Sequence, residues 1–380
     1  MKEIHIEKSK IQAEALSQFI LHGHRGIIAA ATGSGKALIG INYIKHEETR
    51  LKKRLNILLV VPTTKLRDEN WKTEFIEWAN EELYNRIDRL CYASINKVRG
   101  RHYDIIILDE LQNLTPLNSE FFDNNVVDAI MGLSATPPKE LEKKEILNKL
   151  KLQVVYKLSL DDAVKRGVVS PFDIYLVEFN LDDKTKYIKA GNKLKPFMTT
   201  EQKQYEYLTK RINVAQAGNG NSWDSLKFMR LARMRFIYNL QSKKRIGKYM
   251  LGKIIPEDER TLIFAGSIKM AEELESKTYH SKSKDDDFND FFNEKINRLS
   301  AVQALNEGMN IPNLDNALIV QTTSKERHLL QKIGRIIRHR KGHRAKIYLM
   351  YAKGTVDEEW VLKATENISM NNVKHLKFKV

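Results

Sequence analysis

Residues 26–37 read GIIAAATGSGKA, which is a short apolar run, a glycine-rich turn and a lysine. The run Gly26–Ala31 has the composition of a buried strand, and a helical pattern begins directly after the lysine. Glycines let backbone N–H groups approach phosphate oxygens, the N-terminus of the next helix adds its positive dipole end, and Lys36 can reach the β- and γ-oxygens. The form A-x-x-x-x-G-K, from Ala30 to Lys36, therefore predicts a Walker A loop that binds ATP.

The position after this lysine departs from the usual pattern. Ser or Thr ordinarily gives a hydroxyl to Mg²⁺ there, and this chain has Ala37. A water could take the place of the hydroxyl, and the expected consequence ranges from weaker metal affinity to a slow ATPase. The loop residues expected to contact ATP are Ala31, Thr32, Gly33, Ser34, Gly35, Lys36 and Ala37.

Apolar runs alternate with amphipathic helical stretches in both halves of the chain, which is typical of parallel sheets covered on both faces. The expected strands are Gly26–Ala31, Asn56–Val61, Tyr103–Leu108, Val127–Ser134 and Leu152–Leu158, then Thr261–Ala265, Arg298–Val302, Ala317–Gln321 and Lys346–Tyr351. Between these sets the chain is basic and helical in pattern, with helices expected at Thr200–Ala215 and Leu226–Leu251. The sequence thus predicts an α/β protein with two tandem lobes, residues 1–165 and 256–380, joined by a linker and helical connector at 166–255.

An acidic pair follows the expected strand Tyr103–Leu108. Asp109 and Glu110 should project from the carboxyl edge of the sheet, which also carries the phosphate loop. Asp109 is expected to hold Mg²⁺ through its water shell, and Glu110 to orient and deprotonate the attacking water. Such a pair also occurs in solvated turns and helix caps, so the inference depends on its pairing with Lys36.

Further segments complete an ordered set of motifs. Along the chain these are Ala31–Ala37 (motif I), Val60–Thr64 (Ia), Leu108–Leu111 (II), Leu133–Pro137 (III), Leu262–Ser267 (IV), Leu305–Pro312 (V) and Gln331–Arg338 (VI). In these segments the sequence resembles superfamily 2 helicases and translocases over nearly its whole length apart from the connector. The resemblance implies two RecA-like lobes that hydrolyse ATP between them while gripping a nucleic-acid strand.

The resemblance also implies roles for single residues. Arg335 and Arg338 lie three apart on one helical face and could both reach a γ-phosphate, with Arg338 as the arginine finger; a solvated basic face is the alternative. Gln331 would contact the phosphates or the water, and Gln12 would read adenine, with an ordinary glutamine on a helix surface as the alternative. The resemblance further implies that Gly308 and Asn310 contact ATP. It also implies that Ser134 and Thr136 relay the nucleotide state to the surface that grips the strand.

Nucleic-acid contacts are inferred from motif position. They are Thr63, Thr64 and Lys65 in the first lobe, Ser267, Lys269, Thr322 and Thr323 in the second, and Arg230 and Arg233 on a basic face of the connector. An ordinary solvated helix face is the alternative for the connector. Trp71, Phe75 and Trp78 have helical spacing and predict a core face rather than a base-stacking platform.

Charge and composition limit the classes of partner that the protein can have. The formal charge of +16 indicates a polyanionic partner, and no apolar run approaches the roughly 18 residues that spanning a membrane needs. The charged N-terminus lacks the apolar core of a signal peptide, and the single cysteine, Cys91, excludes an internal disulfide. We therefore expect a soluble, unexported, cytoplasmic monomer without a membrane partner, with replication or repair proteins as a candidate partner class.

The predicted function is an ATP-dependent helicase or translocase that uses ATP and Mg²⁺. The acidic motif reads Asp-Glu-Leu-Gln and lacks the Ala-Asp ending of many RNA-remodelling relatives, which favours DNA over RNA and a role in replication, recombination or repair. Motifs V and VI resemble the branch of restriction-enzyme motors and phage branch-migration helicases. The alternatives are an RNA helicase and a nucleotide-gated nucleic-acid clamp with weak ATPase activity.

Overall fold

The computed structural model describes residues 2–79, 81–138, 140–191, 194–217, 223–302, 311–322, 329, 333–334, 340, 342–366 and 368–379. These residues form two compact units. The first contains the described residues up to Pro171 together with Ile333, Gly334, Arg340 and Gly342, and the second contains the remainder. This division differs from the predicted boundaries at 165 and 255, because most of the predicted connector belongs to the second unit.

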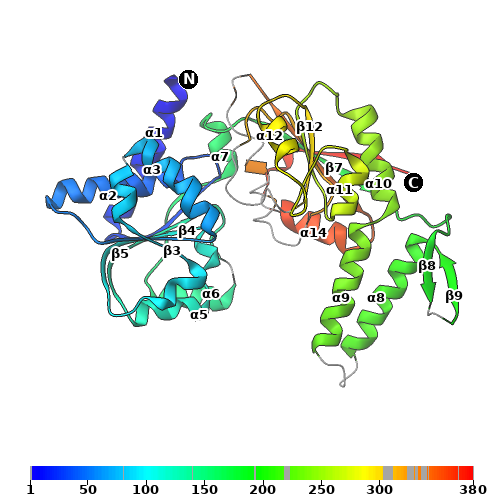
Figure 1. The fold of residues 1–380 in the computed structure, drawn as a ribbon, viewed down its shortest axis with the longest axis horizontal. Coiled ribbons are helices and arrows are strands. Elements are labelled where there is room, and N and C mark those ends of the chain that lie inside the picture. Colours follow the sequence, from blue (N-terminus) through cyan, green and yellow to red (C-terminus); the bar gives the residue numbers. More distant parts are fainter. Residues whose placement is uncertain are drawn as a thin grey trace. The chain divides into compact units, whose positions relative to one another are not determined.

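Six strands form the parallel sheet of the first unit, in the order β3-β2-β4-β5-β1-β6 (Figure 1). The strands are β1 (Arg25–Ala30), β2 (Ile57–Val61), β3 (Asp88–Cys91), β4 (His102–Asp109), β5 (Val126–Ser134) and β6 (Val154–Leu158). The α-helices are α1 (Lys2–Leu21), α2 (Lys36–Leu51), α3 (Lys72–Trp78), α4 (Glu81–Arg86), α5 (Pro116–Ser119), α6 (Leu141–Lys149) and α7 (Leu160–Lys165). Short helical turns are η1 (Leu66–Trp71, π), η2 (Tyr92–Lys97), η3 (Leu111–Asn113) and η4 (Glu120–Asp123).

The strand order explains how distant motifs meet. β5 lies between β1 and β4, and Ala29 pairs with Ser134 while Asp109 pairs with Leu133. All three strands run in the same direction, so the loops after them emerge at one edge of the sheet. β1 and β2 are buried along almost their whole length, as expected for central strands covered on both faces.

The second unit contains a seven-stranded parallel sheet in the order β11-β12-β10-β13-β14-β7-β15. The strands are β7 (Phe172–Phe179), β10 (Thr261–Phe264), β11 (Thr278–Tyr279), β12 (Arg298–Ala301), β13 (Asn316–Ile319), β14 (Ala345–Ala352) and β15 (Val373–Phe378). The helices of this unit are α8 (Glu201–Ala217), α9 (Trp223–Tyr238), α10 (Gln241–Tyr249), α11 (Ile268–Leu274), α12 (Asp286–Phe292) and α14 (Val356–Thr365), with short turns η5 (Met250–Ile254, π) and η6 (Met370–Asn372). Two parallel-sheet α/β lobes therefore confirm the predicted fold class.

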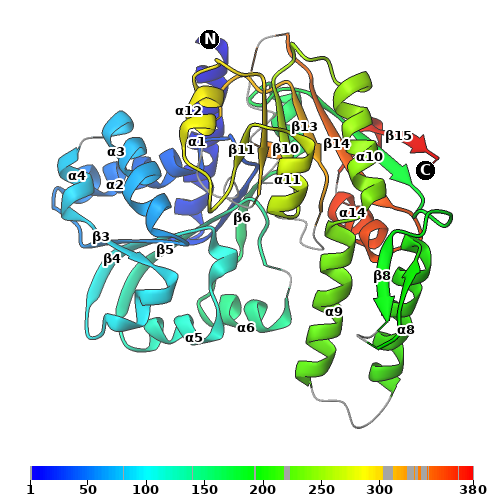
Figure 2. The same cartoon turned by 45° about the vertical axis from the view of Figure 1, so that its right-hand side comes forward.

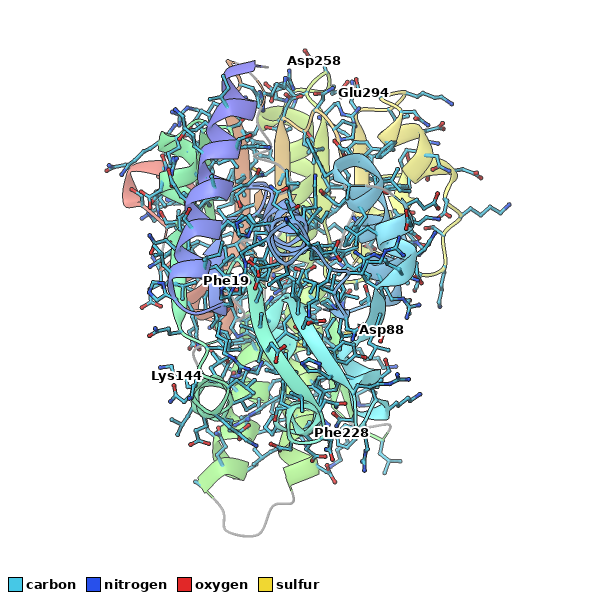
Figure 3. The ribbon with its side chains drawn as sticks, turned by 90° about the vertical axis from the view of Figure 1, so that its left-hand side faces the viewer. Phe19, Asp88, Lys144, Phe228, Asp258 and Glu294 are labelled. Atoms are coloured by element: carbon cyan, nitrogen blue, oxygen red, sulfur yellow. The ribbon has the colours of Figure 1, made fainter. Side chains whose placement is uncertain are left out.

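A pair of long helices, α8 and α9, projects from the second sheet, and Figure 2 shows the two running side by side. The small antiparallel hairpin of β8 (Ile188–Gly191) and β9 (Pro196–Thr199) lies beside α8. Figure 3 labels Phe228, which lies toward the end of α9 that is far from the sheet and has 70% of its surface exposed.

Several local expectations for the connector were wrong. The stretch Leu226–Leu251 is not one helix, because the chain leaves the helix after Tyr238 and Leu240 adopts an extended conformation with its side chain buried in the core. The hairpin β8-β9 and the strand β7 lie where the sequence indicated helix or linker. Within the described residues, none of the helices has both the length and the apolar character that crossing a membrane requires.

Candidate active site

The Walker A loop joins β1 to α2. Gly33 and Gly35 both have φ near +86°, a left-handed conformation that side chains with a Cβ rarely adopt. Ser34 is buried and its hydroxyl donates a 2.8 Å hydrogen bond to the carbonyl of Ala31, which closes the turn. The Lys36 ammonium donates to the carbonyl of Ala30 at 3.0 Å. The loop thus has the backbone form expected of a phosphate cradle, with its lysine folded over the end of β1.

Gln12 lies against this loop. It is buried on α1, and a Cβ placed on Gly35 would come within 2.5 Å of its Nε2 atom. Gln12 also lines an open hollow of about 710 Å³ between α1 and α2. Other residues around this hollow include Leu16, Leu38, Asn42, His46 and Trp78. The structure therefore brings Gln12 to the phosphate loop, and its contact with adenine stays a prediction.

The acidic pair lies at the end of β4. The backbone N–H of Glu110 donates to Oδ1 of Asp109 at 2.9 Å, and the indole N–H of Trp71 donates to Oδ2 at 2.8 Å. Burial and the neighbouring charge of Glu110 raise the pKa of Asp109 to about 6, although the Trp71 hydrogen bond and the Lys36 charge act in the opposite direction. Glu110 itself has a φ of 48°, a strained conformation for a residue with a side chain. Asp109 therefore lies within reach of the Lys36 charge, and Glu110 follows it in an unusual backbone conformation.

A chain of hydrogen bonds leads from Glu110 to the loop after β5. Nε2 of Gln112 donates to Oε2 of Glu110, and the Ser134 hydroxyl donates to Oε1 of Gln112 at 2.6 Å. The same Ser134 oxygen accepts the backbone N–H of Thr136 at 3.0 Å. Gln112 and Ser134 are buried, so these bonds are shielded from water. The predicted coupling residues Ser134 and Thr136 are thus joined to the acidic pair through Gln112.

Sequence reasoning missed the contacts of Trp71 and Gln112. Trp71 and Phe75 do form part of the predicted core face, but the indole N–H also donates to the Asp109 carboxylate, and Trp78 is 38% exposed. In the sequence, Gln112 stands out only as an unusual fourth residue of the acidic motif. That unusual residue is the signal from which its contacts could have been predicted.

Asp109 and the phosphate loop suit Mg²⁺ bound in its usual way, largely through water. Among the described residues, no group of three or more His, Cys, Asp or Glu side chains could hold a metal ion by itself. Mg²⁺ commonly keeps several waters and binds through one carboxylate and substrate phosphates, which suits Asp109 beside the phosphate loop. Each Asp109 oxygen accepts one of the two hydrogen bonds described above, so lone pairs remain on both atoms.

One described residue of motif VI lies in the first unit against the phosphate loop. A Cβ on Gly334 would come within 1.6 Å of Oγ1 and 2.4 Å of Cβ of Thr32, so no larger residue fits there without movement. The hydroxyl of Ser170 also accepts the backbone N–H of Arg340 at 2.9 Å. The predicted residues Gln331, Arg335, Arg338, Gly308, Asn310 and Thr323 lie outside the described residues.

The predicted strand contacts of the first unit follow β2. Thr63 is partly buried, and its hydroxyl oxygen accepts the backbone N–H of Leu66 at 3.3 Å. Thr64 and Lys65 are exposed. These three residues lead directly into η1 and α3, which carry Trp71 and Phe75.

In the second unit the residues predicted to contact nucleic acid differ in how exposed they are. The Ser267 hydroxyl caps α11 by accepting the N–H of Met270 at 3.2 Å and donates to Asn239 at 2.6 Å, while Lys269 is exposed. Thr322 is buried, so a contact with a nucleic-acid strand would require it to become accessible. Among Ser267, Lys269 and Thr322, the members of this set that the structure describes, Lys269 is the most exposed.

On α9, Arg230 is exposed, whereas Arg233 is partly engaged within the helical pair. Its guanidinium donates to the Thr209 hydroxyl at 3.2 Å and lies 5.9 Å from the ring centre of Tyr205. Arg233 therefore helps to hold α9 against α8, and Arg230 is the better candidate for an external anion.

Two family models match the chain. One, described as the res subunit of type III restriction enzymes, matches residues 5–114, and the other, described as the conserved C-terminal domain of helicases, matches residues 248–340. The first match includes the Walker A loop and the acidic pair, and the second includes motifs IV to VI.

A curated relative and two solved structures are similar to the chain. The DNA 3'-5' translocase XPB2 of Sulfurisphaera tokodaii is 24% identical over 379 residues, which cover 93% of this chain and 83% of the relative. The type ISP restriction-modification enzyme LlaBIII, solved bound to DNA, has a TM-score of 0.64 at 15% identity and covers 97% of this chain, which spans only 31% of that enzyme. The Hef helicase domain of Pyrococcus furiosus has a TM-score of 0.54 at 15% identity, with 91% of this chain and 97% of that domain covered. Together with the site at the carboxyl edge of the first sheet, these comparisons show that the chain is similar to helicases and restriction-enzyme motors in both of its units.

Proposed function

We propose that this protein is an ATP-driven motor that translocates along DNA and can displace a paired strand. The observation that carries the proposal is one sheet edge at which Asp109 lies within reach of the Lys36 charge, and at which hydrogen bonds lead from Asp109 and Glu110 through Gln112 to Ser134. These hydrogen bonds connect the proposed nucleotide site to Ser134, whose predicted role is to relay the nucleotide state.

The described residues can each be assigned a role in hydrolysis. Backbone N–H groups of the loop and the Lys36 ammonium would bind the phosphates. Asp109 would hold the metal through water, and Mg²⁺ neutralises phosphate charge when bound. Glu110 would accept a proton from the attacking water at the carboxylate oxygen that Gln112 does not occupy.

The remaining catalytic roles rest on sequence. Arg335 and Arg338 would stabilise charge on the transferred phosphoryl group, with Gln331, Gly308 and Asn310 completing the nucleotide contacts. Because these residues come from the second set of motifs, hydrolysis would depend on closure of the lobes, and reopening would shift two phosphate grips. That cycle is the basis of movement along a strand.

DNA is the favoured track. The net charge of +16 suits a polyanion, and a curated relative is named as a DNA translocase, while a structural relative was solved bound to DNA. Among the described members of the predicted contact set, Thr64, Lys65, Lys269 and Arg230 are exposed. Replication, recombination or repair remains the proposed setting, and RNA is the alternative track.

Ala37 supports a second candidate function. Without the usual hydroxyl, turnover could be slow enough that the protein acts as a nucleotide-gated clamp, which binds nucleic acid without moving along it. The clamp and the motor share the same site but differ in whether hydrolysis is stimulated by the strand.

The deciding experiment is steady-state ATPase activity with no nucleic acid, single-stranded DNA, duplex DNA, forked DNA or RNA. The motor predicts stimulation that Glu110→Gln abolishes and that Glu120→Gln, an exposed acidic control outside the site, leaves unchanged. The nucleic acid that stimulates best identifies the track. A flat and near-zero rate with intact ATP binding would overturn the motor and favour the clamp.

A further inference from the structure

Trp71 makes a contact that its place in the core does not require. It ends the π-helical turn η1, and π-helical turns occur frequently at functional sites. Its side chain is only 3% exposed and its ring lies 5.9 Å from that of Phe75. The indole N–H points to Oδ2 of Asp109 at 2.8 Å. A core tryptophan is thus hydrogen-bonded to the carboxylate that is proposed to hold the metal.

The Walker A loop lacks the hydroxyl that usually helps to bind the metal. Mg²⁺ in P-loop enzymes is ordinarily held by a Ser or Thr hydroxyl as well as by the acidic residue, and here that position is Ala37. Asp109 is therefore the proposed metal-binding side chain of the site, since Glu110 is assigned to the attacking water. Its orientation has to be fixed by other means.

Two donors fix that orientation. The Glu110 N–H binds Oδ1 and the Trp71 N–H binds Oδ2, so the carboxylate is held at both oxygens and cannot rotate about its Cβ–Cγ bond without losing both contacts. An indole N–H donates and never accepts, so it can only partner an acceptor oxygen. Hydrogen bonds to charged groups are also stronger than neutral ones.

We propose that Trp71 is a positioning residue that orients the Asp109 carboxylate toward the metal and so compensates for the missing hydroxyl at Ala37. The inference rests on the proposed nucleotide site but not on movement along DNA. It links a residue after motif Ia to the metal side of the site. The competing explanation is that Asp109 merely satisfies a buried indole N–H.

The test measures how much Mg²⁺ strengthens ADP binding. Calorimetry gives the dissociation constant of ADP with excess Mg²⁺ and with EDTA, and the ratio of the two is the metal gain. Two variants remove the N–H: Trp71→Phe, and Trp71 replaced by 3-benzothienylalanine, which keeps the shape of the indole. Phe75→Leu is the packing control, because Phe75 is buried next to Trp71 on the same helical segment.

Loss of one hydrogen bond to a charged group should reduce the metal gain by roughly tenfold in both Trp71 variants. ADP affinity in EDTA should stay unchanged, and Phe75→Leu should keep the wild-type gain. The inference is overturned if the gain survives in the 3-benzothienylalanine protein. An equal loss of affinity with Mg²⁺ and EDTA would also overturn it, since that pattern indicates a general packing defect.

Restoring the hydroxyl gives an independent check. In an Ala37→Ser background, Trp71→Phe should reduce the metal gain by clearly less than it does in the wild type. Equal losses in the two backgrounds would overturn the compensation. The proposed motor fails separately, through an absence of nucleic-acid-stimulated ATPase activity in the wild-type protein, whereas the metal gain is measured without nucleic acid or turnover.

Discussion

The hydroxyl of Ser134 donates a 2.6 Å hydrogen bond to Oε1 of Gln112, and this contact joins the end of β5 to the turn that follows the acidic pair. Gln112 also donates to Glu110, so one buried amide contacts both the proposed catalytic base and the proposed coupling residue. A buried amide with both ends satisfied is costly to disturb. A shift of Glu110 should therefore displace Ser134, and a shift of Ser134 should displace Glu110.

Replacing Gln112 with Ala should slow hydrolysis without weakening ATP binding. The change removes the donor to Glu110 and the acceptor for Ser134, and loss of a hydrogen bond to a charged group costs about 1.5–3 kcal/mol. A barrier raised by that amount lowers kcat by roughly 10- to 100-fold. ATPase kinetics should show lower kcat at similar KM. Gln112→Glu, which can still accept from Ser134 but cannot donate to Glu110, should be as slow as Gln112→Ala; a wild-type rate would contradict the role of this donor.

Ser134→Ala should separate hydrolysis from movement. The variant leaves the bond between Gln112 and Glu110 in place and removes the contacts of the Ser134 hydroxyl with Gln112 and the Thr136 N–H. We expect ATP hydrolysis to fall less than strand displacement, so fewer steps result per ATP. The check is the ratio of the two rates on the same DNA. A proportional fall of both would argue against a coupling role for Ser134.

Gly334→Ala should weaken ATP binding. Its new methyl would lie 2.4 Å from Cβ of Thr32, and rotation of the Thr32 side chain cannot relieve that overlap. Overpacking of this kind costs about 1–3 kcal/mol, and here it would displace the phosphate loop. Gly252→Ala is the matched control, because nothing lies within 4 Å of a Cβ at that position. Equal affinity for a fluorescent ATP analogue in the two variants would contradict the contact.

The sequence was sufficient for the parts of the site that depend on local pattern. Asp109 and Ser134 end the strands β4 and β5, and Lys36 begins α2 after the loop that follows β1, all at one edge of the sheet. A strand followed by a functional residue can be recognised within about ten positions, because alternation and turn residues are local signals. The contacts of Trp71 and Gln112 depend instead on how distant segments pack.

The same distinction explains the errors in the fold. β7 pairs with β14 and β15, whose residues lie more than 150 positions away, and nothing local in Phe172–Phe179 indicates which sheet it joins. β15 is an edge strand with mostly polar or partly exposed residues and gives little apolar signal. The break before Leu240 was missed because helix propensity on both sides is high, and the break depends on burial of Leu240 in the core.

Asp182→Asn should destabilise the second unit in a pH-dependent way. Burial opposes the charged form of Asp182, but N–H donors of Thr185 and Lys184 and the Arg245 guanidinium outweigh it, so the pKa lies well below its usual range. A carboxyl with a depressed native pKa stabilises the folded state above its unfolded pKa, near 3.9, and this contribution is lost as pH falls below about 4.

We therefore expect Asp182→Asn to cost about 1–2 kcal/mol at neutral pH, because one charged acceptor is replaced by a neutral one. The difference in free energy of unfolding should shrink as pH falls through 4. Thermal unfolding of both proteins from pH 3 to 8 provides the measurement. A difference that is the same at all pH values would show that the charge of Asp182 is not the cause.

A fully buried ion pair holds α10 to α14 in the second unit. Nζ of Lys243 lies 2.7 Å from Oδ2 of Asp357, both side chains have no exposed surface, and Gln321 bonds to both. Lys243→Met leaves the Asp357 carboxylate buried without its counter-charge, which should cost about 3–5 kcal/mol. Asp357→Asn leaves the ammonium in the same position and should also be strongly destabilising.

The double variant decides whether the pair or the packing matters. Lys243→Met with Asp357→Asn removes both charges, and the amide oxygen of Asn can still accept the Ala352 N–H that Asp357 accepts at 3.1 Å. The double variant should therefore be more stable than the sum of the single losses predicts, by several kcal/mol in a double-mutant cycle. Thermal or denaturant unfolding measures each corner of the cycle. Strict additivity would mean that the two charges do not stabilise each other, and the loss in Lys243→Met would then have to come from packing of its aliphatic chain.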